Sequence, residues 1–375
     1  MTDFTHEDHA YMAEAVRLAR RGRLTVTPNP AVGCVIVRGT DIVGRGWHER
    51  AGEPHAEVYA LRAAGDAAHG ATAYVTLEPC NSHGRTPPCT EALIEAGVAR
   101  VIYAVADPNP SVDGQGAARL REAGVSVAGG LLADAAEALN PGYLKRMRTG
   151  RPRVTLKLGQ SLDGAIAMSS GESQWITGSA ARDDVQALRA ESCAILTGVG
   201  TVLADDPALT VRAARFGERP RQPMRVVLDS AIRMSPYARV LREPGATLVI
   251  GARSPGEAEA LTEAGAQYEQ APLTPVGLSL QGIDLDVVLA MLAHRGVNEV
   301  LAECGPRLAG SLLESGLIDR FVFYIAPKLL GSETHGLFAT PNWLKLANGT
   351  RLEIQDARQV GEDFRIEAAP VADPP

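Results

Sequence analysis

Residues 50–57 read RAGEPHAE, and residues 79–90 read PCNSHGRTPPCT. Together they supply one histidine and two cysteines, His55, Cys80 and Cys89, a ligand set that zinc uses in proteins. Three protein ligands leave the fourth position of a tetrahedral ion open for water, as catalytic zinc requires. His55 and Cys89 both follow proline at predicted helix starts, where the helix N-terminus lowers the pKa of a nearby thiol. The two stretches therefore predict a catalytic zinc site on two helix starts.

The acidic residue beside this histidine adds a proton carrier. Glu57 lies two residues after His55, close enough to reach a zinc-bound water without binding the metal. An H-x-E motif followed by P-C is typical of zinc deaminases, in which a carboxylate passes the water proton to the departing amine. The alternative is a closed structural zinc site or a buried cysteine pair. A structural site commonly has a CxxC…CxxC layout, which is absent, although His48 and His83 could in principle close the site.

The pattern around the two stretches predicts one α/β domain at residues 1–148. Apolar spacing predicts helices at 6–21, 55–64, 89–96 and 116–123, and strands at 32–37, 42–47, 72–77 and 101–105. Such alternation implies a sheet with helices packed on both faces. The basic segment 145–153 interrupts the pattern and is interpreted as a connector.

A second α/β domain is predicted at residues 149–375. Strands are expected at 154–158, 194–197, 225–228, 247–250, 299–302 and 321–325, and helices at 180–191, 256–264, 285–294 and 306–315. Residues 216–224 are expected to form a surface loop, and residues 369–375 a frayed tail.

Composition limits the class of protein. The 375 residues include 37 Lys+Arg and 44 Asp+Glu, so the net charge is −7, and 45% of the residues are apolar. These values predict a soluble globular protein of two or three domains. No apolar run is long enough for a membrane span and no secretory signal is present, so we expect a cytoplasmic protein that does not bind a membrane. Mild acidity argues against nucleic-acid binding but not against a small anionic substrate. Five irregularly spaced cysteines favour metal binding or burial over a disulfide framework.

The second half contains no G-x-G-x-x-G, so a standard Rossmann fingerprint is absent. Polar, glycine-containing strings follow the predicted strands instead, where open α/β sheets bind ligands. One of them, ECGPRLAG at 303–310, ends a strand and opens a helix whose free N–H groups could hold a pyrophosphate. Each string alone has an ordinary explanation, since strand-to-helix turns need glycine, and Trp175 could be a core residue.

The combination of motifs resembles a known enzyme family. The PC-x8-C spacing differs from the PC-x-x-C of nucleoside and nucleic-acid deaminases. With TPNPAVGCVIV at 27–37 and RAGEPHAE, it resembles the deaminase domain of the bifunctional riboflavin-biosynthesis deaminase/reductase family. Five further strings resemble the reductase domain of the same family and occur in the same order. They are LKLGQSLDG (156–164), SGESQWITG (170–178), TGVGTVLADDPALTVR (197–212), the E-x-GP-x-LAG string and FYIAPKLLG (323–331). The resemblance covers roughly residues 7–366.

The resemblance implies a cytidine-deaminase-like three-layer α/β/α domain, followed by a dihydrofolate-reductase-like α/β domain. In the first, it implies that zinc is held by His55, Cys80 and Cys89 and that Glu57 is the proton shuttle. It places the substrate contacts at Asn29, His48 and Arg85. One position departs from the family, which has serine and then histidine directly after the first cysteine. Here Asn81-Ser82-His83 follows Cys80, so Ser82 replaces the family histidine.

For the second domain, the resemblance implies an NADPH site and a substrate site. The expected NADPH residues are Gly159, Trp175, Thr201, Asp205, Ser230, Gly305, Pro306, Arg307, Leu308, Ala309, Gly310 and Ser311. The expected substrate residues are Ser173, Arg189, Leu209, Arg212 and Glu303. Arg189 and Arg212 suit a 5′-phosphate because a guanidinium pairs bidentately with its oxygens. Lys157, Asp205 and Glu303 are candidates for the charged groups near hydride transfer.

The expected function is therefore zinc-dependent deamination of 2,5-diamino-6-ribosylamino-4(3H)-pyrimidinone 5′-phosphate, followed by NADPH-dependent reduction of the ribosyl group to ribityl. The family also leads us to expect a homo-oligomer. Two rivals remain: a zinc deaminase of another nucleobase with an inactive reductase half, and a nonenzymatic nucleotide-binding protein with a structural zinc site. Glu57 argues against the second rival, since a structural site has no use for an unligated carboxylate.

Overall fold

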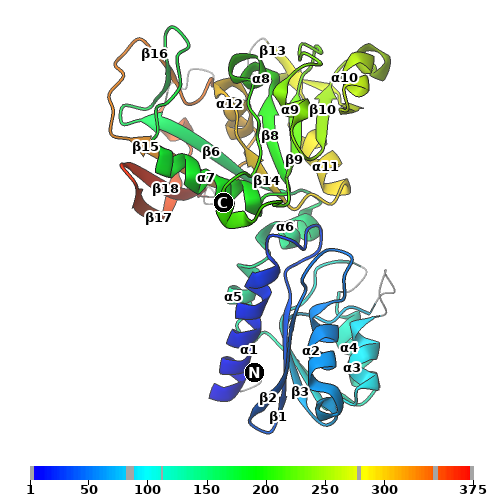
Figure 1. Ribbon diagram of the computed structural model, residues 1–375. Coiled ribbons are helices and arrows are strands. Elements are labelled where there is room, and N and C mark those ends of the chain that lie inside the picture. The colour runs from blue at the N-terminus through cyan, green and yellow to red at the C-terminus, as the bar shows by residue number, and fades with distance from the viewer. Residues whose placement is uncertain (1–3, 82–87, 111–112, 277–279, 341–344, 372–375) are drawn as a thin grey trace. The chain divides into compact units, whose positions relative to one another are not determined.

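The computed structural model describes residues 4–81, 88–110, 113–276, 280–340 and 345–371. The chain divides into two compact units, Met1–Arg151 and Pro152–Pro375 (Figure 1). Within the described ranges, no helix has the length and apolar character needed to cross a membrane.

The first unit is built on a five-stranded sheet with the strand order β2-β1-β3-β4-β5. β1 pairs antiparallel with both β2 and β3, whereas β3, β4 and β5 are parallel. The strands are β1 (Gly33–Arg38), β2 (Asp41–Trp47), β3 (Thr72–Leu77), β4 (Arg100–Val105) and β5 (Ser126–Gly129).

Helices cover both faces of this sheet, as the alternation predicted. In β1, Cys34 and Ile36 point into one core and Val35 and Val37 into the other, because successive strand residues face opposite sides. The core at Val35 also contains residues of α1 (His6–Ala19), α5 (Ala133–Glu137) and α6 (Pro141–Thr149). The opposite core contains residues of α2 (Ala56–Ala64), α3 (Cys89–Glu95) and α4 (Gln115–Glu122), and Figure 1 shows the two groups on either side of the sheet.

Two glycines let helices approach the strands closely. A Cβ on Gly33 would lie 2.0 Å from the carbonyl oxygen of Ala15 in α1, and one on Gly46 would lie 2.2 Å from that of Ala56 in α2. Both distances are far below van der Waals contact, so only glycine fits at these positions. The contact at Gly46 places the first turn of α2, and therefore His55, directly on β2.

The second unit contains a nine-stranded sheet with the order β11-β10-β9-β8-β14-β6-β15-β18-β17. The strands from β11 to β15 are parallel, and β18 and β17 extend the sheet antiparallel. The strands are β6 (Arg153–Ser161), β8 (Ala194–Gly198), β9 (Met224–Leu228), β10 (Thr247–Gly251), β11 (Gln267–Gln270), β14 (Glu299–Ala302), β15 (Arg320–Ala326), β17 (Leu352–Val360) and β18 (Asp363–Pro370).

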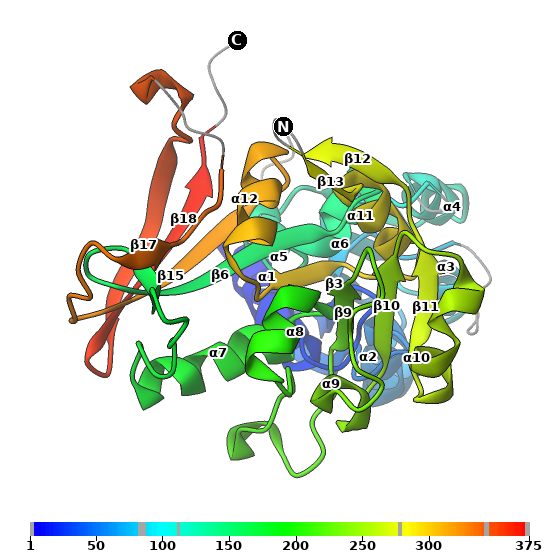
Figure 2. The ribbon, with the colours of Figure 1, turned by 90° about the horizontal axis from the view of Figure 1, so that it is seen from above.

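This sheet also has a core on each face (Figure 2). Leu196 of β8 faces a core formed with α11 (Leu285–His294) and α12 (Pro306–Glu314). The neighbouring Ile195 faces a core formed with α7 (Ser179–Glu191), α8 (Val199–Asp205), α9 (Arg239–Arg242) and α10 (Glu259–Glu263). Because the strands from β11 to β15 are parallel, their carboxyl ends lie along one edge of the sheet, and helices such as α8 begin at that edge.

Short elements complete the two units. β7 (Ala165–Met168) pairs with β16 (Thr334–Gly336), and β12 (Leu273–Val276) pairs with β13 (Leu280–Ile283). Single 3₁₀ turns occur at η1 (Arg20–Gly22), η2 (Gly65–Ala68), η3 (Ala214–Phe216), η4 (Pro255–Ala258) and η5 (Leu346–Asn348).

Three expectations from the sequence need correction. The basic connector is wrong for residues 145–149, which belong to α6, a helix that buries Tyr143 and Leu144. The frayed tail is wrong for residues 369 and 370, which end β18 as it pairs with β17; residues 372–375 lie outside the described ranges. Neither β5 nor β17 was predicted, because both are edge strands whose residues are mostly exposed or half-buried.

Candidate functional site

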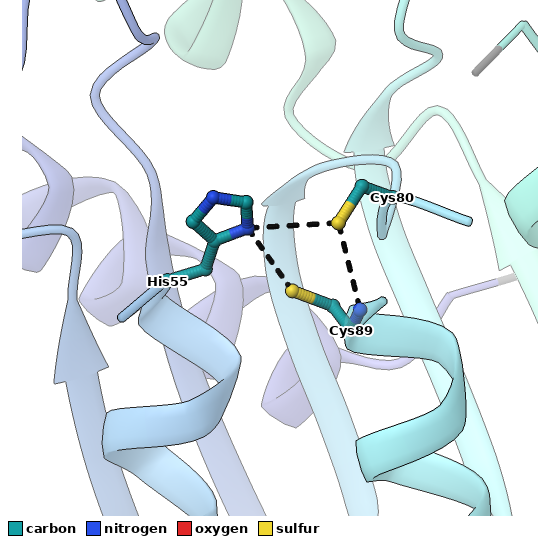
Figure 3. A group of neighbouring side chains, drawn as sticks. All are labelled: His55, Cys80 and Cys89. Carbon is teal, nitrogen blue, oxygen red and sulfur yellow. Dashed lines mark hydrogen bonds between the residues drawn. The ribbon is translucent and has the colours of Figure 1, made fainter. Parts of the chain in front are cut away.

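The metal site expected from the sequence is present as a cluster of three side chains (Figure 3). Nδ1 of His55 lies 3.2 Å from Sγ of Cys89 and 3.5 Å from Sγ of Cys80. His55 immediately precedes α2, Cys89 is the first residue of α3, and Cys80 lies in the loop after β3. Zinc bonds of about 2.0 Å to nitrogen and 2.3 Å to sulfur place tetrahedral ligands about 3.5 Å apart, so the three atoms fit this ion.

The protonation of Cys80 suits a metal ligand, whereas the hydrogen bond with Cys80 and burial raise the pKa of the Cys89 thiol. Hydrogen bonds from Cys89 and His55 lower the pKa of the Cys80 thiol, which favours the thiolate that binds zinc. The backbone N–H of Cys89 adds a third donor, 3.5 Å from Sγ of Cys80. Cys89 is fully buried, and His55 and Cys80 are half-buried. The five cysteines are all free, so none is held in a disulfide.

Glu57 lies in the first turn of α2, close to the three ligands. Its side chain is only 3% exposed, and this burial raises the pKa of the carboxyl group. A raised pKa lets a carboxylate accept a proton and later release it near neutral pH, which is the requirement for a proton shuttle. Glu57 is therefore a buried carboxyl group in the first turn of the helix that follows His55.

His48 and Asn29 form a hydrogen-bonded pair beside the cluster. Nδ1 of the buried His48 lies 3.0 Å from the carbonyl oxygen of Pro54, which can only accept, so this nitrogen carries the proton. Nε2 of His48 then accepts from Nδ2 of Asn29 at 3.1 Å. Burial lowers the pKa of His48, which keeps the ring neutral. His48 therefore does not act as a fourth ligand of the metal site. Because Nδ2 of Asn29 donates to His48, Oδ1 is the atom of the Asn29 amide that can accept a further hydrogen bond.

Arg85, the other expected substrate residue of the first unit, lies outside the described residues. Ser82, which replaces the family histidine, and His83, the remaining candidate for a fourth ligand, also fall in the undescribed segment 82–87.

In the second unit, three charged residues of the predicted site meet. Glu303 directly follows β14, and its carboxylate accepts from Nε and Nη2 of Arg189 at 2.6 and 3.0 Å. Nζ of Lys157, on the neighbouring β6, lies 3.3 Å from the same carboxylate. Burial opposes the ionisation of Glu303, but the charges of Arg189 and Lys157 outweigh it and lower the pKa of Glu303 to about 2. The site therefore contains a fixed carboxylate between two cations.

The two arginines expected to bind a phosphate differ in availability. Arg189 uses its guanidinium on Glu303 and on the carbonyl oxygen of Thr210, 3.0 Å away. Arg212 is exposed, and burial of its inner part together with the charge of Arg189 lowers the pKa of its guanidinium. Its backbone N–H donates to Gln186, a buried residue that the sequence did not reveal. Leu209, buried nearby in the chain, has a left-handed backbone with φ 49°.

The expected pyrophosphate site lies at the starts of α8 and α12, which follow the neighbouring strands β8 and β14. No side chain caps the N-terminus of α12, so its first-turn N–H groups remain available to an anion. The backbone N–H of Gly305 donates to Oγ1 of Thr201 at 3.2 Å, which joins the two helix starts. These features fit an NADPH pyrophosphate. Residues 305–311 form this helix start and its first turns.

Trp175 is not a core residue, because 62% of its surface is exposed. The guanidinium of Arg182 lies 4.5 Å from the centre of its ring, and Nζ of Lys328 donates to its carbonyl oxygen. Such an exposed ring supported by cations fits a cofactor-binding surface. Neither Arg182 nor Lys328 was singled out from the sequence, because a lone cation has no local signal.

The remaining expected residues lie at strand ends or in loops. Gly159 is in β6, Ser230 is exposed two residues after β9, and Ser173 is half-buried in the loop before α7. Asp205 ends α8 and is exposed; among the described contacts it makes no ion pair, so the structure does not bring it into the group formed by Lys157 and Glu303. Two sequence strings of the resemblance do meet, since Asp163 accepts from the backbone of Leu330 and Gly331 at 3.0 and 2.8 Å.

Two known protein families match the two units of the chain separately. Residues 5–105 match the family described as the cytidine and deoxycytidylate deaminase zinc-binding region, and residues 152–366 match the RibD C-terminal domain. The chain is 52% identical over 367 residues to the riboflavin biosynthesis protein RibD of Escherichia coli (strain K12), covering 95% of this chain and 98% of that protein. The chain belongs to the RibD family.

Solved structures of the RibD family agree with the fold. A RibD structure from Acinetobacter baumannii superposes with a TM-score of 0.90 at 42% identity, covering 98% of this chain and 99% of that chain. A deaminase/reductase structure from Thermotoga maritima gives a TM-score of 0.83 at 30% identity, again covering 98% and 99%. The fold expected from the sequence, a cytidine-deaminase-like domain followed by a reductase domain, is therefore confirmed.

Proposed function

We propose that this member of the RibD family catalyses two successive steps of riboflavin synthesis. It deaminates 2,5-diamino-6-ribosylamino-4(3H)-pyrimidinone 5′-phosphate, and then reduces the ribosyl group with NADPH to give 5-amino-6-ribitylamino-uracil 5′-phosphate. The observation that carries the proposal is the cluster of His55, Cys80 and Cys89 beside a buried Glu57, in a chain whose second half matches the RibD C-terminal domain.

For the first step, His55, Cys80 and Cys89 would hold zinc, which when bound would acidify a water molecule. Glu57 would accept a proton at its carboxylate and deliver it to the leaving amine, so that ammonia departs and a ring carbonyl remains. The Oδ1 of Asn29, oriented through His48, presents an acceptor to an N–H group of the pyrimidine. Arg85 is assigned to the same substrate on the resemblance alone.

In the second step, NADPH supplies the hydride to the sugar C1. Gly159, Trp175, Thr201, Ser230 and the start of α12 are assigned to the cofactor, with Asp205 at the end of α8. Ser173, Leu209, Arg212 and the pair of Arg189 and Glu303 are assigned to the substrate. Nζ of Lys157 lies 3.3 Å from the Glu303 carboxylate, and Lys157 is our candidate for protonating the sugar ring oxygen, which leaves C1 when the hydride reaches it.

The domain assignment belongs to this proposal. Residues 1–148 are assigned to the deaminase and residues 149–375 to the reductase; the division into compact units after Arg151 supports this. A homo-oligomer and a cytoplasmic location, both expected from the sequence, stay predictions. Sedimentation velocity of the purified protein tests the first.

Mass spectrometry of the reaction tests the proposed function. The purified protein is incubated with the diaminopyrimidine phosphate, with and without NADPH. Without NADPH, the product should show exchange of an amine for a carbonyl oxygen. With NADPH, it should gain two further hydrogens. Deamination without any reduction would refute the second step and show an inactive second half, and no mass change in either reaction would refute the whole proposal.

A further inference from the structure

Glu78, the residue before Pro79-Cys80, is a buried carboxylate that the mechanism above does not use. It is 3% exposed. Its Oε1 accepts from the backbone N–H of Ala117 at 3.0 Å, and its Oε2 accepts from that of Gly114 at 3.2 Å and, more weakly, from that of Asp107 at 3.4 Å. Within the described part of the chain, its carboxylate therefore accepts from backbone N–H groups of residues 107–117.

These bonds make Glu78 the cap of a helix to which it does not belong. The N-cap residue of α4 is Gly114, which has no side chain to satisfy the free N–H groups of the first turn. Glu78 satisfies two donors at this helix start, those of Gly114 and Ala117, from the end of β3. A carboxylate is favourable there because the helix dipole is positive at its N-terminus.

The first turn of α4 also presses on the segment that carries the zinc ligand. A Cβ on Gly116 would lie 1.9 Å from the carbonyl oxygen of Pro79. The backbone of α4 therefore contacts Pro79, the residue before Cys80. Glu78, the residue before Pro79, stabilises this contact through its hydrogen bonds to the start of α4. The two residues directly before Cys80 are thus held by hydrogen bonds to the start of α4 and by contact with its backbone.

We propose that Glu78 is a positioning residue of the deaminase, which clamps the Pro79-Cys80 segment against α4 and so holds the Cys80 sulfur where His55 and Cys89 complete the zinc site. The inference rests on the proposed function. Residues that orient metal ligands from outside typically change metal affinity or activity 10- to 100-fold when they are substituted.

Glu78→Gln separates this role from simple capping. Glutamine has the same shape and keeps one acceptor, but its NH₂ group faces backbone donors and cannot accept from them. A purely structural role predicts lower stability, because a buried N–H at the start of α4 loses its acceptor, but unchanged zinc release, cobalt spectrum and kcat. A positioning role predicts zinc release to a coloured chelator about tenfold faster or more, an altered absorption spectrum of the cobalt-substituted enzyme, and a lower deaminase kcat with an unchanged KM.

Glu122→Gln is the matched control. Glu122 makes the same chemical change possible on the same helix, as the exposed last residue of α4, at the opposite end from Gly114 and Gly116. We expect its zinc release and cobalt spectrum to equal those of the unsubstituted enzyme. Reductase activity on supplied intermediate is the internal control for all variants and should not change.

Several outcomes would overturn the proposal. Zinc release and a cobalt spectrum unchanged in Glu78→Gln would do so, as would equal effects in Glu122→Gln. If Glu78→Gln does not fold, Glu78→Asp keeps the charge but withdraws it by one methylene, and normal zinc release in that variant would refute the role. Failure of the unsubstituted enzyme to deaminate the pyrimidine would instead refute the proposed function, while the zinc measurements would still decide the role of Glu78.

Discussion

At the scale of single residues, Glu57 combines nearness to a metal site with a buried carboxyl group whose pKa is raised. We expect Glu57→Gln to lower the deaminase kcat by about 10³-fold, within the range of general acid–base catalysis, because the amide cannot carry the proton. Zinc content should be unchanged, since the three ligands remain. Ammonia release and metal analysis measure the two effects. Loss of reduction of supplied intermediate would contradict separable sites.

Asn29 depends on the proton arrangement of His48. In Asn29→Asp, a carboxylate oxygen would face the unprotonated Nε2 of His48, so two acceptors would oppose each other. We expect the deaminase KM to rise about tenfold, equivalent to one lost hydrogen bond, with the reductase rate as the control. A KM equal to that of the unsubstituted enzyme would show that the amide orientation is not used in substrate binding.

At the scale of elements, the end of β14 lies beside the middle of the parallel strand β6, which brings Glu303 and Lys157 together, and α7 adds Arg189. The pKa of Glu303 is lowered from 4.5 to about 2, so folding favours its ionised form. This stabilisation, about 3 kcal/mol, is complete above pH 4.5 and is lost as the pH falls towards 2. In Glu303→Gln, the free energy of unfolding of the second unit should therefore depend less on pH in the acid range.

Thermal unfolding of the reductase unit, followed between pH 6 and pH 3, measures this effect. The variant should also be less stable at neutral pH, because Arg189 and Lys157 lose their partner. An acid dependence as steep as that of the unsubstituted enzyme would mean that other carboxylates control it.

Elements with a buried face were predictable from the sequence, whereas exposed ones were not. β1 and β8 are apolar runs buried on both faces, so their sequences indicate strands. β17 has mostly exposed residues and gains its order from pairing with β18, which no local pattern encodes. The helix α6 was missed because its basic residues dominate the composition, although Pro141 at its start and Gly150 at its end are ordinary helix boundaries.

The site shows the same division. His55, Glu57, Cys80 and Cys89 were found because their spacing has one chemical purpose. The bonds of Arg189 to Glu303, of Lys328 to Trp175 and of Ala117 to Glu78 join residues 114, 153 and 39 positions apart. Spacing along the chain contains no information about such contacts, so the structure was needed to find them.

At the scale of the whole molecule, each unit has its own sheet and cores, and each candidate site is formed within one unit. Removal of zinc with a strong chelator should therefore abolish ammonia release while leaving NADPH oxidation with supplied intermediate within about twofold of its normal rate. Restoring zinc should restore the first reaction. Parallel loss of both activities would show that the reductase depends on the metal site.

The close approach of α1 to Gly33 and of α2 to Gly46 has a consequence for protein engineering. Because the carbonyl oxygens of Ala15 and Ala56 occupy the space of a methyl group at Gly33 and Gly46, even alanine at either position must displace a whole helix. A library that randomises the deaminase scaffold will lose nearly every member that changes these two codons. Attempts to widen its substrate range are better directed at the loops that surround the site.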